Sequence, residues 1–256
     1  MKRLFAWLGG EFLSALSEGG RLGLLFTEAV YWLVRPPLRL RMFFRQMEFV
    51  GVNSLFVVML TSLFTGMVLA LQTYYAFRLF SAESLVGATV ALSMTRELGP
   101  VITALMVTGR AGSSIAAEIG TMRVTEQVDA LTVMAINPVQ YLVTPRVFAG
   151  LVMLPLLTVV SDFVGIVGGY LVGVNLLGIN GGIFMNRIYE LVKFEDIYNG
   201  LIKAAAFGVI MTLVGCYKGF YTTGGAEGVG RATTESVVLA SVLILASDYI
   251  LTSFMM

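Results

Sequence analysis

The sequence predicts an all-α membrane protein that crosses the bilayer several times, and three observations carry this prediction. Of its 256 residues, 57% are hydrophobic and only 13% are charged, a balance outside the usual range of soluble domains. Several stretches with little or no charge exceed the roughly 20 residues that a helix needs to cross a membrane. The chain has no histidine and one cysteine, Cys216, so the commonest general base and metal ligand are missing. We therefore expect a transport or scaffold protein and not an enzyme.

Residues 1–48 predict a helix that lies in the membrane interface and is followed by a basic elbow. Leucine and aromatic side chains are interspersed with charges from Leu4 to Phe26, and the apolar part that follows is too short to span. Pro36 and Pro37 are expected to end this helix. Arginines then alternate with apolar residues, a pattern typical of contact with anionic headgroups or of a flank that only sets topology. These arginines are Arg39, Arg41 and Arg45.

Residues 49–256 are expected to form one domain with five membrane-spanning helices. Phe49 to Phe77 carries no charge and predicts the first of them. In the third, Gly165, Gly169 and Gly173 recur every four residues, which favours close helix packing. Loops are expected at residues 180–196 and 218–231. The other four spans are Ser84 to Gly109, Val147 to Leu177, Ile197 to Tyr217 and Ala232 to Phe254.

The longest charged interruption lies between the second and third spans, in residues 110–146. Its first half carries Gly112, Ala116 and Gly120 at four-residue spacing, smooth enough for another backbone to approach. From Val124 onward an apolar stripe follows at helical spacing among polar residues, until Asn137-Pro138 is expected to stop the helix. Such a helix suits docking on a soluble partner, or resting on lipid headgroups. The stripe consists of Val128, Leu131 and Ala135.

Charged residues in the apolar spans mark the candidate site. Arg96 and Glu97 lie near the centre of the second span, where burying a charge costs several kcal/mol. As sequence neighbours they point about 100° apart on a helix and do not simply pair. Pro100 removes a backbone donor, which predicts a kinked helix or a re-entrant hairpin. The pair either faces a polar ligand or is a structural charge held between helices.

Three further charges lie at membrane depth: Asp162, Lys203 and Asp248. At 1.5 Å per residue, Lys203 and Asp248 lie at matching depths, about 9 and 10 Å inside the outer ends of spans four and five. The match predicts that they form an ion pair. Otherwise Lys203 would extend to the interface and hydroxyl groups would cap Asp248.

The distribution of basic residues predicts the orientation. Most Lys and Arg residues lie in residues 1–48, 109–146 and 218–231, whereas the other loops carry only Arg78, Arg187 and Lys193. The positive-inside rule therefore places the N-terminus and residues 110–146 in the cytoplasm and the C-terminus outside. The chain has no phosphate-binding loop of the G-x-x-x-x-G-K-[ST] type, so ATP would have to act through another subunit.

The run AEIGTMRVTEQVDAL, from Ala117 to Leu131, resembles the signature of the MlaE permease family. The likeness extends to Ser81-Ala82-Glu83, Arg96 to Pro100, Thr144-Pro145-Arg146 and Gly230 to Thr234, and so covers nearly the whole chain. That family supplies the membrane subunit of ABC transporters of the MCE type, which maintain the lipid asymmetry of the outer membrane. The resemblance implies a multi-pass protein of the bacterial inner membrane that moves phospholipid to or from a periplasmic partner.

The resemblance also implies partners and site residues. It suggests a homodimer that works with a cytoplasmic ABC ATPase, a periplasmic hexamer of MCE-domain subunits and, as an optional partner, a STAS-domain protein. The chain itself would hold no cofactor, because ATP and Mg²⁺ bind the ATPase, and no nucleic acid is involved. The implied lipid-binding residues are Leu69, Gln72, Thr73, Ala76, Phe77, Phe80, Arg96 and Glu97. The implied ATPase-coupling residues are Arg123, Thr125, Glu126, Gln127, Asp129 and Leu131.

The sequence is also compatible with other functions. The face of the first span that carries Gln72 and Phe77 is equally typical of ordinary helix packing. A proton-coupled secondary transporter would use Glu97 or Asp162 as a relay and would need no ATPase. A structural scaffold would have no lipid pocket at all.

Overall fold

The computed structural model describes residues 2–35 and 40–255, and all regular structure in these ranges is helical. Short π-helical turns join several of the helices, at Met94–Leu98, Thr108–Gly112, Val139–Val143 and Leu171–Leu176, and 3₁₀ turns occur at Val52–Ser54 and Glu83–Leu85. The α-helices are α1 (Lys2–Val34), α2 (Leu40–Val50), α3 (Leu55–Arg78), α4 (Val86–Ser93), α5 (Gly99–Val107), α6 (Ser113–Val124), α7 (Gln127–Val133), α8 (Thr144–Tyr170), α9 (Gly181–Leu191), α10 (Phe194–Phe220) and α11 (Gly225–Met255).

Five helical stretches of the described chain are long and apolar enough to cross a membrane, which confirms the all-α polytopic class. They are Leu40–Arg78, Glu83–Val124, Val139–Leu176, Phe194–Phe220 and Gly225–Met255. α1 is not among them. The main difference from the expectation is the second stretch, because residues 109–124 continue the helix and do not form a loop.

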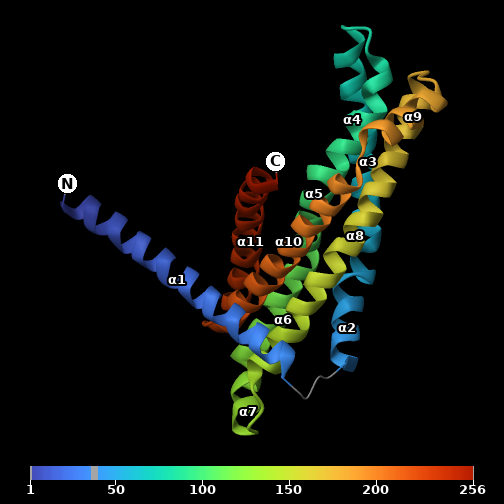
Figure 1. Ribbon diagram of the computed structural model, residues 1–256. Coiled ribbons are helices and arrows are strands. Elements are labelled where there is room, and N and C mark those ends of the chain that lie inside the picture. Colours follow the sequence, from blue (N-terminus) through green and yellow to red (C-terminus); the bar gives the residue numbers. More distant parts are fainter. Residues whose placement is uncertain (1, 36–39, 256) are drawn as a thin grey trace.

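The helices form an elongated bundle with α8 and α10 at its centre (Figure 1). α3 lies against α8, and α11 lies against α10 and α6. α7 projects at one end of the bundle, which we call the α7 end, and α9 lies near the opposite end, the α9 end. The N-terminal part of α1 extends away from the bundle, and its last turns pack through Leu25 and Ala29 against residues around Val143.

Small residues allow close contact between the long helices, as their spacing predicted. Gly165 and Gly169 of α8 are buried against α3 and α4, and a Cβ atom at Gly66 of α3 would overlap the carbonyl oxygen of Gly165. The hydroxyl groups of Ser62 and Ser161 lie 2.6 Å apart across the same contact. Gly112, Ala116 and Gly120 of the second span are likewise buried, where the backbone of α6 meets α10.

Replacing Gly66 by alanine should therefore lower the stability of the bundle. The added methyl group has no space beside the Gly165 carbonyl, and overpacking of this kind costs about 1–3 kcal/mol. Gly109→Ala is the matched control, because no atom lies within 4 Å of a Cβ atom at Gly109. Thermal unfolding in detergent should give a lower midpoint for Gly66→Ala alone. Equal midpoints for the two variants would contradict the close contact between α3 and α8.

Several expected loop boundaries are wrong because helices fill the loops. Residues 180–196 contain α9, which begins where Asn180 Oδ1 accepts hydrogen bonds from the backbone N–H groups of Gly182 and Ile183. Residues 218–231 contract to a turn at 221–224, because α10 runs to Phe220 and α11 starts at Gly225. At the other end, α1 is one helix to Val34. The proposed break at Pro36-Pro37 and the role of Arg39 lie outside the described residues.

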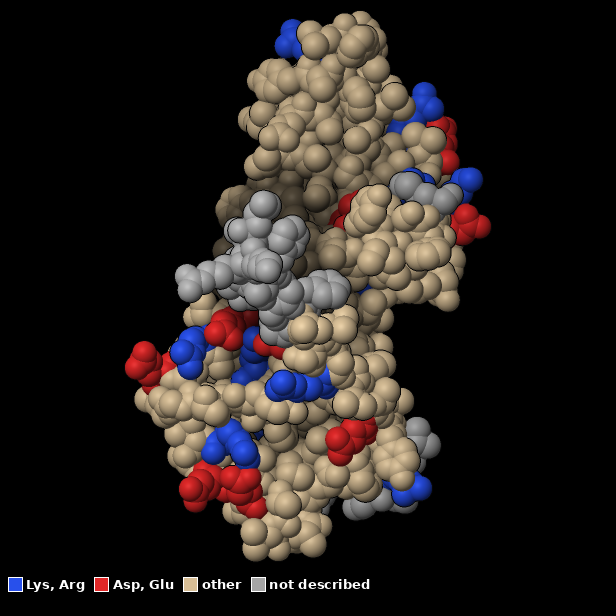
Figure 2. Space-filling view, turned by 90° about the vertical axis from the view of Figure 1, so that its left-hand side faces the viewer, with Lys and Arg blue, Asp and Glu red and all other residues tan. Residues whose placement is uncertain are grey.

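Charge is unevenly distributed over the surface. Figure 2 shows charged side chains crowded into the lower half of one face, the half that ends in α7. The part above them is mostly uncharged apart from its right-hand edge and a basic side chain at the top. This distribution is typical of a protein with an apolar belt in the bilayer and a charged end in water.

Candidate functional site

The second membrane-spanning stretch contains the break that Pro100 predicted. It passes without reversal from Glu83 to Val124, with a π-helical turn at Met94–Leu98, so the re-entrant hairpin is excluded. Pro100 has no N–H group to donate to the carbonyl oxygen of Arg96 four residues before it. Lys203 of α10 takes the place of that donor, with its Nζ atom 3.1 Å from the Arg96 oxygen. The break in the helix thus creates a polar attachment point for a neighbouring helix.

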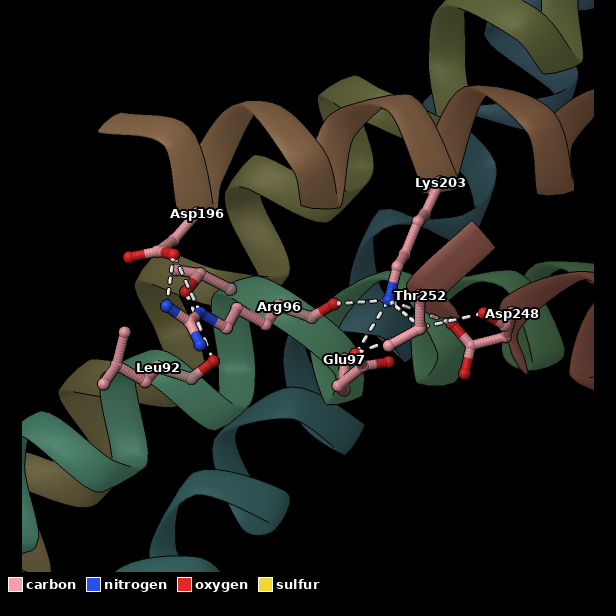
Figure 3. Close-up of polar contacts among 8 residues, drawn as sticks. Leu92, Arg96, Glu97, Asp196, Lys203, Asp248 and Thr252 are labelled. Atoms are coloured by element: carbon pink, nitrogen blue, oxygen red, sulfur yellow. Dashed lines mark hydrogen bonds and ion pairs between the residues drawn. The ribbon is translucent and has the colours of Figure 1, made fainter. Parts of the chain in front are cut away.

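Lys203 is the centre of a network that joins three helices (Figure 3). Its side chain is only 3% exposed, and its Nζ atom lies 2.8 Å from Glu97 Oε1 and 2.6 Å from the hydroxyl oxygen of Thr252 on α11. Asp248 Oδ1 lies 3.3 Å from the same ammonium group, an ion pair without hydrogen-bond alignment. A buried ammonium group is tolerated here because carboxylate and neutral oxygens surround it.

Arg96 points to a second carboxylate, that of Asp196. The Nη2 and Nε atoms of Arg96 lie 2.6 and 2.8 Å from Asp196 Oδ1, a two-point contact that fixes the guanidinium group. Asp196 Oδ2 accepts a hydrogen bond from the backbone N–H of Lys193 and so caps the start of α10. The Asp196 carboxylate therefore caps the start of α10 and also binds Arg96 in the π-helical turn of the second span.

These charges border a cavity of about 280 Å³ between the π-helical turn, α10 and α11. The Arg96 side chain is 44% exposed and that of Glu97 36%, so both keep groups available to a ligand. A cavity with a guanidinium and carboxylates at membrane depth suits a polar headgroup. Its lining is completed by Glu195, Asp196, Asn199, Lys203, Thr252 and Met255.

The structure confirms two interpretations of these charges and adds two residues to them. Arg96 and Glu97 do not pair with each other, and Lys203 pairs with Asp248, as their matching depths predicted. Sequence reasoning missed Asp196 and Thr252. For Asp196 a signal existed, because an acidic residue just before a long apolar run is typical of a helix start. Thr252 carried no such signal, since a lone threonine in an apolar helix is unremarkable.

The expected lipid-binding face of α3 is divided in the structure. Leu69 and Gln72 border an open, mostly apolar groove of about 350 Å³ together with Phe64, Val68 and Leu98. Leu98 follows Glu97 directly, so the π-helical turn separates this groove from the polar cavity. Four other members of the face do not line the groove. Thr73 donates to the backbone oxygen of Leu69, and Phe77 packs against the buried cluster that includes Ala70 and Val86. Ala76 is exposed, and Phe80 lies beyond the end of α3 with 80% of its surface exposed.

Asp162 of α8 lies on the other side of the same break. Its side chain is buried, and a Cβ atom at Gly99 would overlap its Oδ1 atom. That oxygen has no hydrogen-bond partner among the described residues. The absence of a side chain at Gly99 therefore makes room for a carboxyl group beside the break.

The segment that carries the implied ATPase-coupling residues, 123–131, forms a helical hairpin at the α7 end. α6 ends at Val124, Glu126 adopts a left-handed backbone conformation with φ 58°, and α7 follows. An ion pair between Arg123 and Asp129 spans the turn, and Gln127 Nε2 donates to Thr125 Oγ1 at 3.1 Å. Glu126, Gln127 and Asp129 are exposed, so these polar side chains are available to a partner.

The apolar stripe of this segment does not serve as the contact surface that its pattern suggested. Val128 and Leu131 are buried against Leu142, inside the chain's own core. α7 ends at Val133, before Ala135, which has a φ of 57° and is exposed. The large apolar side chains that α7 presents outward are instead Val133, 88% exposed, and Met134, 61% exposed.

Asn137 begins the following helix and does not stop α7. Its Oδ1 atom accepts hydrogen bonds from the backbone N–H groups of Val139 and Gln140 at 2.8 and 3.2 Å. Its Nδ2 atom donates to Glu28 Oε1 of α1 at 3.2 Å. The return from α7 into the membrane is thereby attached to α1.

Comparison with known proteins connects this arrangement to one family. Residues 43–254 match the family described as Permease MlaE. The chain is 41% identical to the intermembrane phospholipid transport system permease protein MlaE of Haemophilus influenzae, over 97% of this chain and 95% of the relative. It is 50% identical to a probable ABC transporter permease protein of Rickettsia felis, over 96% and 95%. It is 39% identical to the chloroplastic protein TRIGALACTOSYLDIACYLGLYCEROL 1 of Arabidopsis thaliana, over 93% and 68%. The chain therefore belongs to the MlaE permease family.

Proposed function

We propose that this chain is the permease subunit of an ABC transporter that moves phospholipid between the inner membrane and a periplasmic MCE-domain partner. The observation that carries the proposal is the network around Lys203, which borders a polar cavity at membrane depth. Charges in a membrane span are costly, and they are usually retained where they contact a polar substrate. The phospholipid named for the Haemophilus relative fits this chemistry.

The two hollows beside the π-helical turn suit the two parts of a phospholipid. Arg96 and Glu97 would contact the headgroup in the polar cavity, and Leu69 and Gln72 would contact an acyl chain in the apolar groove. Thr73, Ala76, Phe77 and Phe80 would extend this path toward the end of the first span. Leu98, which follows Glu97, lines the groove and so places the two regions next to each other.

The energy would come from a separate cytoplasmic ATPase that holds ATP and Mg²⁺. In this proposal the α7 end faces the cytoplasm, and α7 docks on the ATPase through its exposed polar residues and through Val133 and Met134. The chain would act as a homodimer, which is supported by the exposed apolar side of α11 that carries Val238 and Val242. A periplasmic MCE-domain hexamer would receive or deliver the lipid, and a STAS-domain protein is an optional further partner.

Glu97→Gln tests the assignment of the cavity. Glutamine keeps an oxygen that can accept from Lys203 but removes the charge, so the fold should persist while headgroup binding weakens. We expect the phospholipid that co-purifies and the rate of ATP-driven transport to fall roughly tenfold, which corresponds to about 1.4 kcal/mol. The control is Glu190→Gln, an exposed residue that pairs with Arg187 on α9. Unchanged lipid content and transport in a folded Glu97→Gln protein would refute the assignment.

A proton-coupled secondary transporter is the second candidate, and the buried Asp162 favours it. A carboxyl group with an unpartnered oxygen beside a helix break could exchange protons during transport. Reconstitution of the chain alone in liposomes distinguishes the two mechanisms. Lipid movement driven by a pH gradient without an ATPase would favour this candidate, and its absence would favour the ABC transporter.

A further inference from the structure

A second cavity, of about 480 Å³, lies at the α7 end, between α2, α6 and the start of α8. It shares no lining residue with the cavity beside the Lys203 network, which lies near the start of α10 and the end of α11. Its volume falls within the roughly 300–1,000 Å³ of pockets that hold small ligands. It therefore has room for the headgroup end of a lipid and for the beginning of a chain.

The polar wall of this cavity contains a buried arginine whose hydrogen bonds are incomplete. Arg146 is only 3% exposed; its Nη1 atom donates to the backbone oxygen of Leu142 at 2.7 Å, and its Nη2 atom lies 2.8 Å from Glu118 Oε2. Its Nε atom has no partner among the described residues, and neither does Oε1 of Gln46 in the same wall. Buried polar groups in proteins nearly always have partners, so the unpaired Arg146 Nε and Gln46 Oε1 leave this wall of the cavity incompletely hydrogen-bonded.

The charge of the cavity selects an anion. Arg45 of α2 lines the same cavity as Arg146, with an exposed side chain. Glu118 is the acidic residue of the lining and already offsets one of the two positive charges. One positive charge is left, and two guanidinium groups are the usual partners of a phosphate.

The remaining walls are apolar and held in place. Met42, Phe49, Met122 and Leu142 line them. The carbonyl oxygen of Phe49 accepts a hydrogen bond from Arg110 Nη1 at 2.6 Å, and the Arg110 guanidinium lies 5.1 Å from the centre of the Phe49 ring. α2 is fixed on α8 by an edge-to-face contact between Phe43 and Phe148. The cavity is thus a preformed amphipathic pocket.

We infer that this pocket binds one anionic phospholipid from the membrane leaflet at the α7 end, with its phosphate between Arg45 and Arg146 and an acyl chain against Phe49 and Met122. The pocket lies where the first, second and third spans end, which is the level of lipid headgroups. The site differs from the cavity of the proposed transport path. It requires only that the chain be in a membrane, so it stands or falls independently of phospholipid transport.

Site-specific crosslinking tests the inference on the full-length chain. Met122 is replaced by p-benzoylphenylalanine, and the purified protein is titrated in detergent with dioleoyl phosphatidylglycerol before illumination. We expect saturable crosslinking of the lipid, and a roughly tenfold higher half-saturating concentration after Arg45→Ala, because an exposed arginine contributes one charge-assisted contact to the phosphate. Arg187→Ala, which removes an exposed arginine on α9, should leave the titration unchanged. A titration that Arg45→Ala does not shift would overturn the inference.

Competition experiments identify the chemistry of the ligand. Dioleoylglycerol, which lacks the phosphate, should not compete, and neither should free inorganic phosphate at millimolar concentration. Effective competition by dioleoylglycerol would show an apolar groove without a phosphate site, and competition by phosphate alone would show a site for soluble anions. Either result would overturn the lipid assignment. Glu97→Gln should leave the crosslink intact, so that a failure of the transport proposal is distinguished from a failure of this one.

Arg146→Lys provides a second variant with a readout besides folding. Lysine keeps the positive charge that faces Glu118 but removes the unpartnered Nε atom. We expect the protein to fold and to bind dioleoyl phosphatidylglycerol several-fold more weakly than the unaltered chain does. Binding as tight as that of the unaltered chain would contradict the role of the Nε atom. If Arg146→Lys does not fold, the result for Arg45→Ala decides.

Discussion

Replacing Lys203 by methionine should destabilise the bundle by about 3 kcal/mol and abolish transport. Methionine has a similar length but leaves Glu97, Asp248 and the carbonyl oxygen of Arg96 without the ammonium group that they share. Breaking a buried ion pair by removing one partner costs about 3–5 kcal/mol, and the partial exposure of Glu97 places the expectation at the lower limit. Thermal unfolding in detergent should show a midpoint lower by roughly 5–10 °C.

The reason for this large effect can be tested with a second substitution in the same network. In an Asp248→Asn background the ion pair with Lys203 is already gone. Lys203→Met should then lower the free energy of unfolding by about 0.5–3 kcal/mol less than it does in the unaltered chain, which is the usual coupling energy of residues in contact. Lys193→Met, at an exposed position just before α10, is the control and should leave the midpoint unchanged. If the stability losses of Lys203→Met and Asp248→Asn simply add in the double variant, the contact between the two residues does not stabilise the protein.

The network also shows which parts of the structure the sequence could predict. Span positions follow from the length of apolar stretches, and the Lys203 and Asp248 pair followed from depth alone, because helices in a bilayer run roughly parallel and equal depths bring residues to one level. The break at Pro100 followed from the missing N–H group. These inferences depend on local chemistry and on the constant rise of a helix.

Other features depend on contacts that no local pattern encodes. Residues 109–124 contain three charges and therefore resemble a loop, yet glycines let them pack as helix against α10. The spacing of Val128 and Leu131 is the same whether the stripe faces a partner or the chain's own core. Only the packing against Leu142 shows that it faces the core. The ion pair between Arg96 and Asp196 joins residues 100 positions apart in the sequence, a separation that no local pattern bridges.

The apolar stripe of α7 faces the chain's own core and not outward, which changes the residues that should matter for an ATPase partner. Because Val128 and Leu131 are buried within the chain, the apolar contact would have to come from the exposed Val133 and Met134 at the C-terminal end of α7. Val133→Asp should therefore leave the fold intact and strongly weaken association with the ATPase. Loss of a central apolar contact in an interface costs about 2 kcal/mol or more, which is a roughly thirtyfold weaker complex.

Co-purification of the ATPase with the tagged chain, followed by ATP hydrolysis in nanodiscs, measures this expectation. Tyr189→Asp is the matched control, because Tyr189 is 76% exposed on α9 near the opposite end of the bundle. Leu131→Asp should behave differently from Val133→Asp, because it places a charge in the core beside Leu142 and should lower the thermal midpoint of the isolated chain. If Val133→Asp retains the ATPase at full activity, α7 does not dock through its exposed end, and a contact through Glu126, Gln127 and Asp129 alone would have to transmit the coupling.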